Sequence, residues 1–543
     1  FPARRPPDLG RVDPADHNNE AIRISCPNGH IDVVRLLLAD RRVDPTTRHN
    51  EAIRAACYHD HVDVVRLLLA DRRVNPADDN NEAIRWACAN GHVDVVRLLL
   101  NDGRVNPADE NNDAIILACE HGHVDVVRLL LANARVNPAD NHNKAIQLAV
   151  EYNHIDLVRL LLTNSRVDPG DNDNLAIHVA CAKGYTDVVR LLLADARVNP
   201  ADHDNHAIRH ACAYGHIDVV RLLLADPRVD PADQNNYAIR RACAHNHVDV
   251  VRLLLADSRV NPADHNNDAI ILACAHGDID VVRLLLADRR VNPADDHNKA
   301  IQRACSYGHI DVVRLLLADD RVNPSDSKNL AIQQACAYGH IDVVRLLLTD
   351  PRVNPADRNN EAIQLACANG HVDVVRLLLA DARVDPAANN NEAIRFACRN
   401  GHIDVVRLLL ADDRVNPANN MAFEWACTKG RVDIVRLLLD DDRIDPARGN
   451  NLAIRWACEG GHIDVVRLLL ADDRVNPGDS KNDAIQQACA HGHIDVVRLL
   501  LADSRVDPAD NDNRALRLAC QYSHFDLLRL LLTDSRVART KGT

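Results

Sequence analysis

Large aromatic side chains are scarce in this sequence of 543 residues. Phenylalanine, tyrosine and tryptophan together make up 3% of it, and methionine occurs once. A chain of this length would ordinarily form three or four globular domains. So few rings argue against conventional cores built on large aromatic side chains.

The sequence also lacks an excess of basic residues, long apolar runs and a leader segment. Its formal charge of −14 argues against a surface for nucleic acid or for an anionic membrane. Each "VVRLLL" run carries an arginine in its middle, so no run reaches the length of a membrane span. The opening residues "FPARRPPDLG" show no methionine and no signal-peptide pattern, so we expect a fragment or a processed product.

What the sequence does contain is a repeat. Its sixteen cysteines recur every 31 residues, apart from a 62-residue step over Val150 and a 29-residue step before Cys427. They occupy one position of a unit that occurs seventeen times, and we call these units copy one to copy seventeen. A period of this size predicts a solenoid, in which each unit buries its apolar faces against its neighbours.

Copy three, "NEAIRWACANGHVDVVRLLLNDGRVNPADEN", shows the unit best, and it predicts two helices. Asn81 is a good N-cap residue, and all seventeen copies have asparagine in that position. Gly91 is expected to end the first helix, and Pro107 prevents continuation of the second. Four copies fill the glycine position with residues that also tolerate a left-handed backbone, namely Asp60, Asn153, Asn246 and Ser523.

The unit resembles the ankyrin repeat, whose "A-A-x-x-G-H-x-E-V-V-x-L-L-L" pattern is matched by "ACANGHVDVVRLLL". The resemblance implies an all-α solenoid of stacked helix-turn-helix repeats. "E-A-I-R" replaces the family's "T-P-L-H", and the unit is shorter than 33 residues, so short turns are expected between copies. The expected organisation is a tail of a preceding repeat at 1–18, a single solenoid of seventeen repeats at 19–537, and a C-terminal tail at 538–543.

Neither the cysteines nor the histidines predict a metal site or an enzyme. Equivalent residues in stacked repeats lie about 8–10 Å apart, beyond the Cα separation of about 7 Å that a disulfide allows. Reduced, buried cysteines are therefore expected, which favours the cytoplasm. The histidine that follows the glycine position should form hydrogen bonds in the turn between the helices. His203, His206 and His210 include the helical spacing of a zinc face, but no third ligand has an ordered spacing, so no metal or cofactor is predicted.

The positions that vary between copies predict a binding surface. In ankyrin-like repeats, the residues after the first helix line the concave groove, so the resemblance places binding there. The second residue after the cysteine position is a ring in copies seven to eleven, and arginines flank these rings. Tyrosine and arginine are enriched at interface hot spots, whereas the other interpretation is that the rings only cover the helix ends. The predicted residues are Tyr214, His245, His276, Tyr307 and Tyr338, flanked by Arg240, Arg241 and Arg303.

A second candidate patch surrounds the irregular copy fourteen, where "PANNMAFEWAC" lacks two residues of the usual connection. Phe396, Trp425 and Trp456 occupy the same position, two residues before cysteine, in copies thirteen to fifteen. Met421 and Lys429 lie one helical turn from Trp425. Because the same position holds arginine in other copies, the rings are expected to reach solvent; the alternative is that they fill the core.

These patterns predict a non-enzymatic scaffold that binds a protein or peptide along the concave face, with no nucleic-acid or membrane partner. Two alternatives remain at this stage. One is a structural protein that associates end to end, suggested by the apolar Phe525, Leu527 and Leu528 of copy seventeen. The other is the substrate-recognition arm of a larger adaptor protein.

Overall fold

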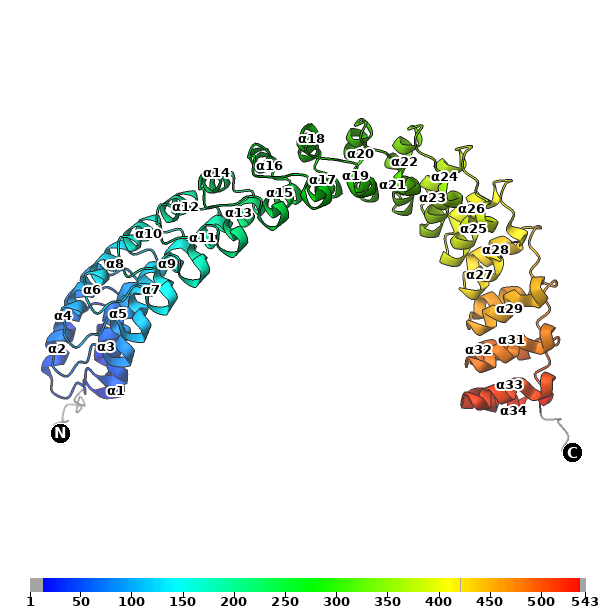
Figure 1. The fold of residues 1–543 in the computed structure, drawn as a ribbon. Helices are drawn as coiled ribbons and strands as arrows, with labels where there is room; N and C mark the ends of the chain where they lie inside the picture. The colour runs from blue at the N-terminus through cyan, green and yellow to red at the C-terminus, as the bar shows by residue number, and fades with distance from the viewer. Residues whose placement is uncertain (1–12, 420, 538–543) are drawn as a thin grey trace, which may run out of the picture. The chain divides into compact units, whose positions relative to one another are not determined.

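A computed structural model describes residues 13–419 and 421–537. The chain divides into two compact units, Phe1–Asp264 and His265–Thr543, and each is described by itself. In both units every copy contributes a first and a second helix, and the described residues contain no strand (Figure 1). The predicted all-α repeat architecture is therefore confirmed. The exact span of a single solenoid at 19–537 stays a prediction.

In unit 1 the first helices form one layer and the second helices another. The first helices are α1 (Asp16–Ser25), α3 (Thr47–Tyr58), α5 (Asp78–Ala89), α7 (Asp109–Glu120), α9 (Asp140–Glu151), α11 (Asp171–Lys183), α13 (Asp202–Ala213) and α15 (Asp233–Ala244). The second helices are α2 (Ile31–Ala39), α4 (Val62–Ala70), α6 (Val93–Leu100), α8 (Val124–Leu131), α10 (Ile155–Leu162), α12 (Thr186–Leu193), α14 (Ile217–Ala225) and α16 (Val248–Leu255).

Unit 2 repeats this arrangement, with one irregular first helix. The first helices are α17 (Asp264–His276), whose first residue belongs to unit 1, α19 (Asp295–Ser306), α21 (Asp326–Ala337), α23 (Asp357–Asn369), α25 (Ala388–Asn400), α27 (Ala422–Thr428), α29 (Arg448–Glu459), α31 (Asp479–Ala490) and α33 (Asp510–Gln521). The second helices are α18 (Ile279–Ala287), α20 (Ile310–Leu317), α22 (Ile341–Leu348), α24 (Val372–Leu379), α26 (Ile403–Leu410), α28 (Val432–Leu439), α30 (Ile463–Leu470), α32 (Ile494–Leu501) and α34 (Phe525–Thr533). A short 3₁₀ helix, η1 (Pro417–Asn419), precedes α27.

The core lies between these layers and is built from small side chains. In copy three, Ala83, Ile84, Ala87 and Cys88 are fully buried, and the second helix adds Leu99. All sixteen cysteines are free thiols and fifteen of them are buried, as predicted, while Cys520 in copy seventeen is exposed. Burial raises the pKa of the buried thiols, to about 12 for Cys26, so they remain protonated and unreactive.

The first helices pack against one another more extensively than the second helices do within each unit. The reason is that alanine and cysteine on the first helices let their backbones approach closely. Side chains at the C-terminal ends of neighbouring first helices are therefore brought side by side, and the candidate binding residues lie at these ends.

A left-handed turn lies within the N-terminal part of the first helix of each regular copy. In copy three, Asp79, Asn80 and Asn81 have φ values of 53°, 55° and 58°. A left-handed residue other than glycine costs about 1–2 kcal/mol, and asparagine tolerates this backbone better than most residues. The turn is thus conformationally expensive, and contacts with the neighbouring copy must compensate.

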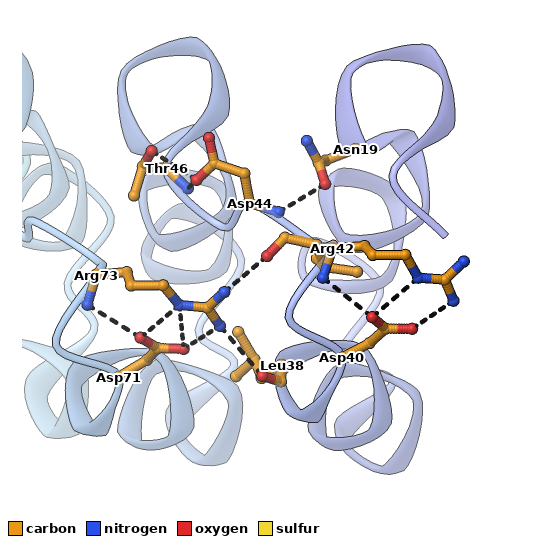
Figure 2. Close-up of polar contacts among 9 residues, drawn as sticks. Asn19, Leu38, Asp40, Arg42, Asp44, Thr46, Asp71 and Arg73 are labelled. Carbon is orange, nitrogen blue, oxygen red and sulfur yellow. Dashed lines mark hydrogen bonds and ion pairs between the residues drawn. The ribbon is translucent and has the colours of Figure 1, made fainter. Parts of the chain in front are cut away.

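The invariant asparagine provides these contacts, which corrects its predicted role as an N-cap. The side chain of Asn81 is 5% exposed and bridges to the next copy. Its Oδ1 accepts a hydrogen bond from the Asn106 amide at 2.7 Å, and its Nδ2 donates to Asp109 at 2.8 Å. Figure 2 shows the first of these contacts in copy one, from the amide of Asp44 to Asn19. Both side-chain groups of Asn81 are used between copies, so it does not cap its own helix.

An arginine in the loop after the second helix forms a clasp with the preceding copy (Figure 2). Asp71 accepts hydrogen bonds from the amide and guanidinium of Arg73. The guanidinium also donates to the carbonyls of Val43 at 2.7 Å and Leu38 at 3.1 Å. The same clasp recurs at Arg104, Arg197, Arg228, Arg259, Arg321, Arg352, Arg383, Arg414, Arg443, Arg474, Arg505 and Arg536.

The glycine–histidine pair also connects neighbouring copies, rather than only the two helices of one copy as expected. Gly91 ends α5 with φ +76°, as predicted, and Asp60, Asn153, Asn246 and Ser523 also have positive φ. The ring of His123 lies against Gly91 so closely that a Cβ there would approach its Nδ1 to 2.5 Å. The same ring donates from Nε2 to the carbonyl of Ala89 in the preceding copy at 2.9 Å.

The junction before copy fourteen departs from this pattern, while both helices of that copy are formed, as predicted. Met421 is left-handed with φ 60°, and α27 begins directly after it. Phe423 occupies the isoleucine position and is 3% exposed. Arg448, in a position where most copies have aspartate, donates to the carbonyl of Ala418 at 2.9 Å. The predicted N-cap at residue 420 lies outside the described residues.

Candidate binding face

In unit 1, an arginine–tyrosine cleft lies between the C-terminal ends of α13 and α15. It has a volume of about 500 Å³. The predicted residues Tyr214, Arg241 and His245 line it together. Tyr214 is 58% exposed, and His245 is exposed as well. The other residues of the cleft are Arg209, His210, Ala213, Tyr237 and His247.

Tyr237 organises the charge of this cleft. Its ring lies 5.5 Å from the guanidinium carbon of Arg209, 5.3 Å from that of Arg240 and 5.8 Å from that of Arg241. Such cation–π contacts contribute about 0.5–1 kcal/mol each at exposed sites. The ring therefore gathers three positive charges that would otherwise repel one another.

His210 lies among these charges in the same cleft. Burial lowers its pKa, and the nearby guanidinium groups of Arg209 and Arg241 lower it further. A neutral imidazole can accept a hydrogen bond as well as donate one. The cleft thus combines fixed positive charge, aromatic surface and a neutral ring at His210.

In unit 2, a tyrosine cleft lies between the C-terminal ends of α19 and α21. It has a volume of about 370 Å³ and contains Arg303, Tyr307 and Tyr338, which the sequence analysis named. Both tyrosines are more than half exposed, at 56% and 59%. The remaining residues of this cleft, Ser306, Gln334 and His340, form its floor through hydrogen bonds between the copies. His276, also in unit 2, is exposed at the end of α17.

The predicted aromatic patch is half-buried throughout. Phe396, Trp425 and Trp456 are each partly exposed. The rings of the two tryptophans lie 6.2 Å apart, and the guanidinium of Arg399 lies 5.0 Å from the Trp425 ring. Met421 is also partly exposed, and Lys429 is exposed. These side chains pack between copies and also present surface. They therefore partly fill the core and partly reach solvent.

A histidine cluster on α11 and α13 lies beside the arginine–tyrosine cleft. The ring of His178 lies 4.7 Å from that of His206 and 6.0 Å from that of His203, measured between centroids. The ring of His210 lies 3.9 Å from that of His206 and is tilted against it. Burial lowers the pKa of His178 and of His206 to about 4. Beside this cluster, ligand atoms of Asp173, Asp202 and His203 lie close enough together to hold a metal ion.

Two residues of these sites were missed by the sequence analysis. Tyr237 directly follows the invariant asparagine, where no other copy has a tyrosine, phenylalanine or tryptophan, and this difference could have identified it. His178 lies 28 residues before His206, and the same offset separates Asn81 from Asp109. Only knowledge of this offset between copies could have placed His178 in the cluster.

Comparison with known proteins decides the family. A family model described as ankyrin repeats (3 copies) matches residues 55–140, 86–173, 146–235, 177–267, 208–295, 239–326, 270–359, 332–420, 411–479 and 454–541. The chain belongs to the ankyrin-repeat family. No curated protein matches this ankyrin-repeat sequence. In the described part of the chain, none of the helices combines the length and apolar character needed to cross a membrane.

Proposed function

We propose that this ankyrin-repeat protein is a non-enzymatic scaffold that binds a protein or peptide along the exposed ends of its first helices. Ankyrin repeats are in general protein–protein interaction modules. The observation that carries the proposal is the pair of open clefts, each lined by tyrosine and arginine from two neighbouring copies. Free, buried thiols fit a reducing compartment such as the cytoplasm.

The chemistry of the clefts favours a segment that combines acidic and apolar side chains. Guanidinium groups pair with carboxylates in a planar, bidentate geometry. In the unit 1 cleft, Arg209 and Arg241 are held over one ring and are therefore partly preorganised for such a pair. The exposed rings of Tyr214, Tyr307 and Tyr338 offer apolar surface at a small cost in side-chain entropy. Recognition would use several weak contacts, each from one copy.

A peptide-display selection on the full chain tests this function. Peptides selected on the wild-type protein should bind at least about tenfold more weakly to the R303A/Y307A/Y338A variant, because hot-spot tyrosine and arginine side chains contribute about 1–2 kcal/mol or more each. The Y214A/R241A variant provides the matching measurement for the unit 1 cleft. W425A does the same for the aromatic patch, whose role in binding also remains a proposal.

The matched control removes arginines from the opposite layer. Arg314, Arg345 and Arg376 are exposed on α20, α22 and α24, and their alanine variants should bind the selected peptides normally. Thermal melting should be unchanged in the tyrosine-cleft variant, because its three side chains are exposed. Equal binding by the cleft variants and the control would contradict the assignment. Light scattering against concentration tests end-to-end association, which stays a prediction, as does a role as the recognition arm of an adaptor.

A further inference from the structure

His178 and His206 occupy a pair of positions that elsewhere hold an ion pair. In other copies an arginine in the position of His178 contacts a carboxylate 28 residues later, as in Arg54–Glu82 and Arg85–Asp113. Arg23–Glu51 and Arg455–Asp483 follow the same pattern. Copies six and seven instead place two imidazoles beside each other, tilted by 57°, with neither the cation nor the anion of this pair.

Two nitrogens of this pair have no partner among the described residues. The side chain of His178 is 7% exposed, and its Nε2 forms no hydrogen bond. The Nδ1 of His206 is also buried and without a partner. Buried polar atoms are nearly always satisfied by protein, water or an ion. A metal ion bound by both rings, once they turn toward it, would satisfy both nitrogens.

The ring spacing suits one metal ion. Two imidazoles on a tetrahedral zinc ion, with Zn–N bonds of about 2.0–2.1 Å, have ring centroids about 5 Å apart. The distances of 4.7 Å from His178 to His206 and 6.0 Å from His178 to His203 bracket this value. The ring of His210 lies 3.9 Å from that of His206, which suits a ring that orients its neighbour rather than a fourth ligand.

Carboxylates complete the donor set. The Nε2 of His203 lies 3.3 Å from a carboxylate oxygen of Asp173. Ligand atoms of Asp173, Asp202 and His203 all lie within 4.8 Å of one another. The three histidines border a cleft of about 410 Å³ together with Asp204 and Arg209. Arg209 donates to the His203 carbonyl and lies over Tyr237, and its charge contributes to the lowered pKa of His178 and of His206.

We propose that His178, His203 and His206, together with a carboxylate of Asp173 or Asp202, bind one divalent transition-metal ion. Three imidazoles and one carboxylate favour zinc, copper or nickel over magnesium and calcium, which prefer oxygen ligands. The site joins copies six and seven, so the ion replaces the ion pair that other copies use. The sequence analysis predicted no metal because it did not place His178 beside His206.

The repeat supplies substitutions that fit each position. Glutamine occupies the position of His178 in five other copies, and in three of them it is buried, as Gln333, Gln364 and Gln486. His178→Gln, His203→Asn and His206→Leu therefore each introduce a residue that the same position carries elsewhere in the chain. His265→Asn is the control, because His265 holds the position of His203 in copy nine, where neither facing histidine is present.

Calorimetric titration of the metal-free full chain with Zn²⁺ is the test, and circular dichroism confirms the fold of each variant. One equivalent should bind to the wild type and to His265→Asn. The affinity should fall at least about tenfold in His178→Gln and in His203→Asn. With Co²⁺ as the probe, the wild type should show the visible absorption of a nitrogen- and oxygen-ligated ion, and His178→Gln should lose it.

Three results would overturn the proposal. The first is the absence of a stoichiometric Zn²⁺ site in the wild type. The second is an affinity that His178→Gln leaves unchanged, since surface histidines would then bind the ion adventitiously. The third is an equal loss in His265→Asn. Peptide binding at the tyrosine cleft of unit 2 is measured separately, so failure here leaves the proposed scaffold function untouched.

Discussion

The regular junction after copy three and the shortened junction before copy fourteen both join neighbouring copies, but through different hydrogen bonds. At the regular junction, Asn81 is buried and bridges to both Asn106 and Asp109. At the shortened one, Asn391 is half-buried, and its side chain accepts a hydrogen bond from the Asn416 amide. The deletion leaves Asn419, rather than an aspartate, 28 residues after Asn391.

The arginine clasp, in contrast, is the same at both junctions. Arg443 donates to the carbonyls of Val415 at 3.2 Å and Leu410 at 3.0 Å across the deletion. The equivalent contacts of Arg73 reach two residues further back along the chain. The clasp binds the loop before the deleted segment, so the deletion changes its sequence offset but not its geometry. The asparagine bridge uses the aspartate position next to the deletion, so the deletion affects this bridge more than it affects the clasp.

The largest effect is expected at the asparagine bridge. Asn81→Ala should destabilise its junction by about 3 kcal/mol, because it removes two hydrogen bonds and places alanine in a left-handed backbone. Asn391→Ala should cost less, about 2 kcal/mol, because Asn391 has no aspartate partner 28 residues later to match Asp109. Hydrogen exchange followed by mass spectrometry measures the local opening free energy at each junction.

Glycine variants provide the control for backbone strain. Asn81→Gly and Asn391→Gly tolerate positive φ, so the difference between their losses of stability isolates the contribution of the hydrogen bond to aspartate. Inserting Asp–Asn after Ala418 should restore an aspartate 28 residues after Asn391 and raise the cost of Asn391→Ala to that of Asn81→Ala. Equal losses of stability in Asn81→Ala and Asn391→Ala of the unmodified chain would show that the hydrogen bond to Asp109 contributes nothing.

A smaller effect, and no difference between the junctions, is expected at the clasp. Arg73→Ala and Arg443→Ala should each cost about 1–2 kcal/mol, because each loses two bonds to the preceding copy. Arg135→Ala should cost less than about 0.5 kcal/mol, since Arg135 follows Asn133 and its only contact shown for the described chain uses the backbone amide. Local exchange at copies two, four and fourteen measures all three. A greater loss at Arg443 than at Arg73 would contradict an unchanged clasp.

The smallest expected effect is the dependence of stability on pH, which has opposite signs at the two junctions. Glu424 is 5% exposed beside the shortened junction, and burial raises its pKa above 4.5. Its folded form therefore binds a proton more readily, and copy fourteen should gain stability as the pH falls from neutral through the raised pKa. The Arg73 hydrogen bond lowers the pKa of Asp71, so the clasp should lose stability only as the pH falls below about 4.

Urea unfolding followed by the fluorescence of Trp425 and Trp456 measures this gain. Glu424→Gln should raise the unfolding midpoint at neutral pH and abolish the gain on mild acidification, because glutamine occupies the same position in copies that bury it, as at Gln333. A midpoint that Glu424→Gln lowers at neutral pH would mean that the charged carboxylate stabilises this copy.

The sequence alone predicts the features that depend only on residues within one copy. The helices, the buried cysteine position and the positive φ at Gly91 follow from the apolar pattern and from local backbone preferences. The role of Asn81 was misassigned because asparagine before a helix is usually an N-cap, whereas its actual partners lie 25 and 28 residues later. His178 was missed for the same reason. Contacts between copies require the stacking offset, which a single copy does not contain.

In the regular copies, each bridging contact joins a copy to its immediate neighbour at a constant sequence offset. The asparagine amide reaches Asp109 from Asn81 over 28 residues, and the clasp reaches Val43 from Arg73 over 30. A misaligned exchange between two gene copies that adds or removes one whole unit therefore leaves each remaining copy with a suitable partner. The length of the array is free to drift during evolution at almost no cost in folding, whereas the two-residue deletion before copy fourteen required a new contact at Arg448.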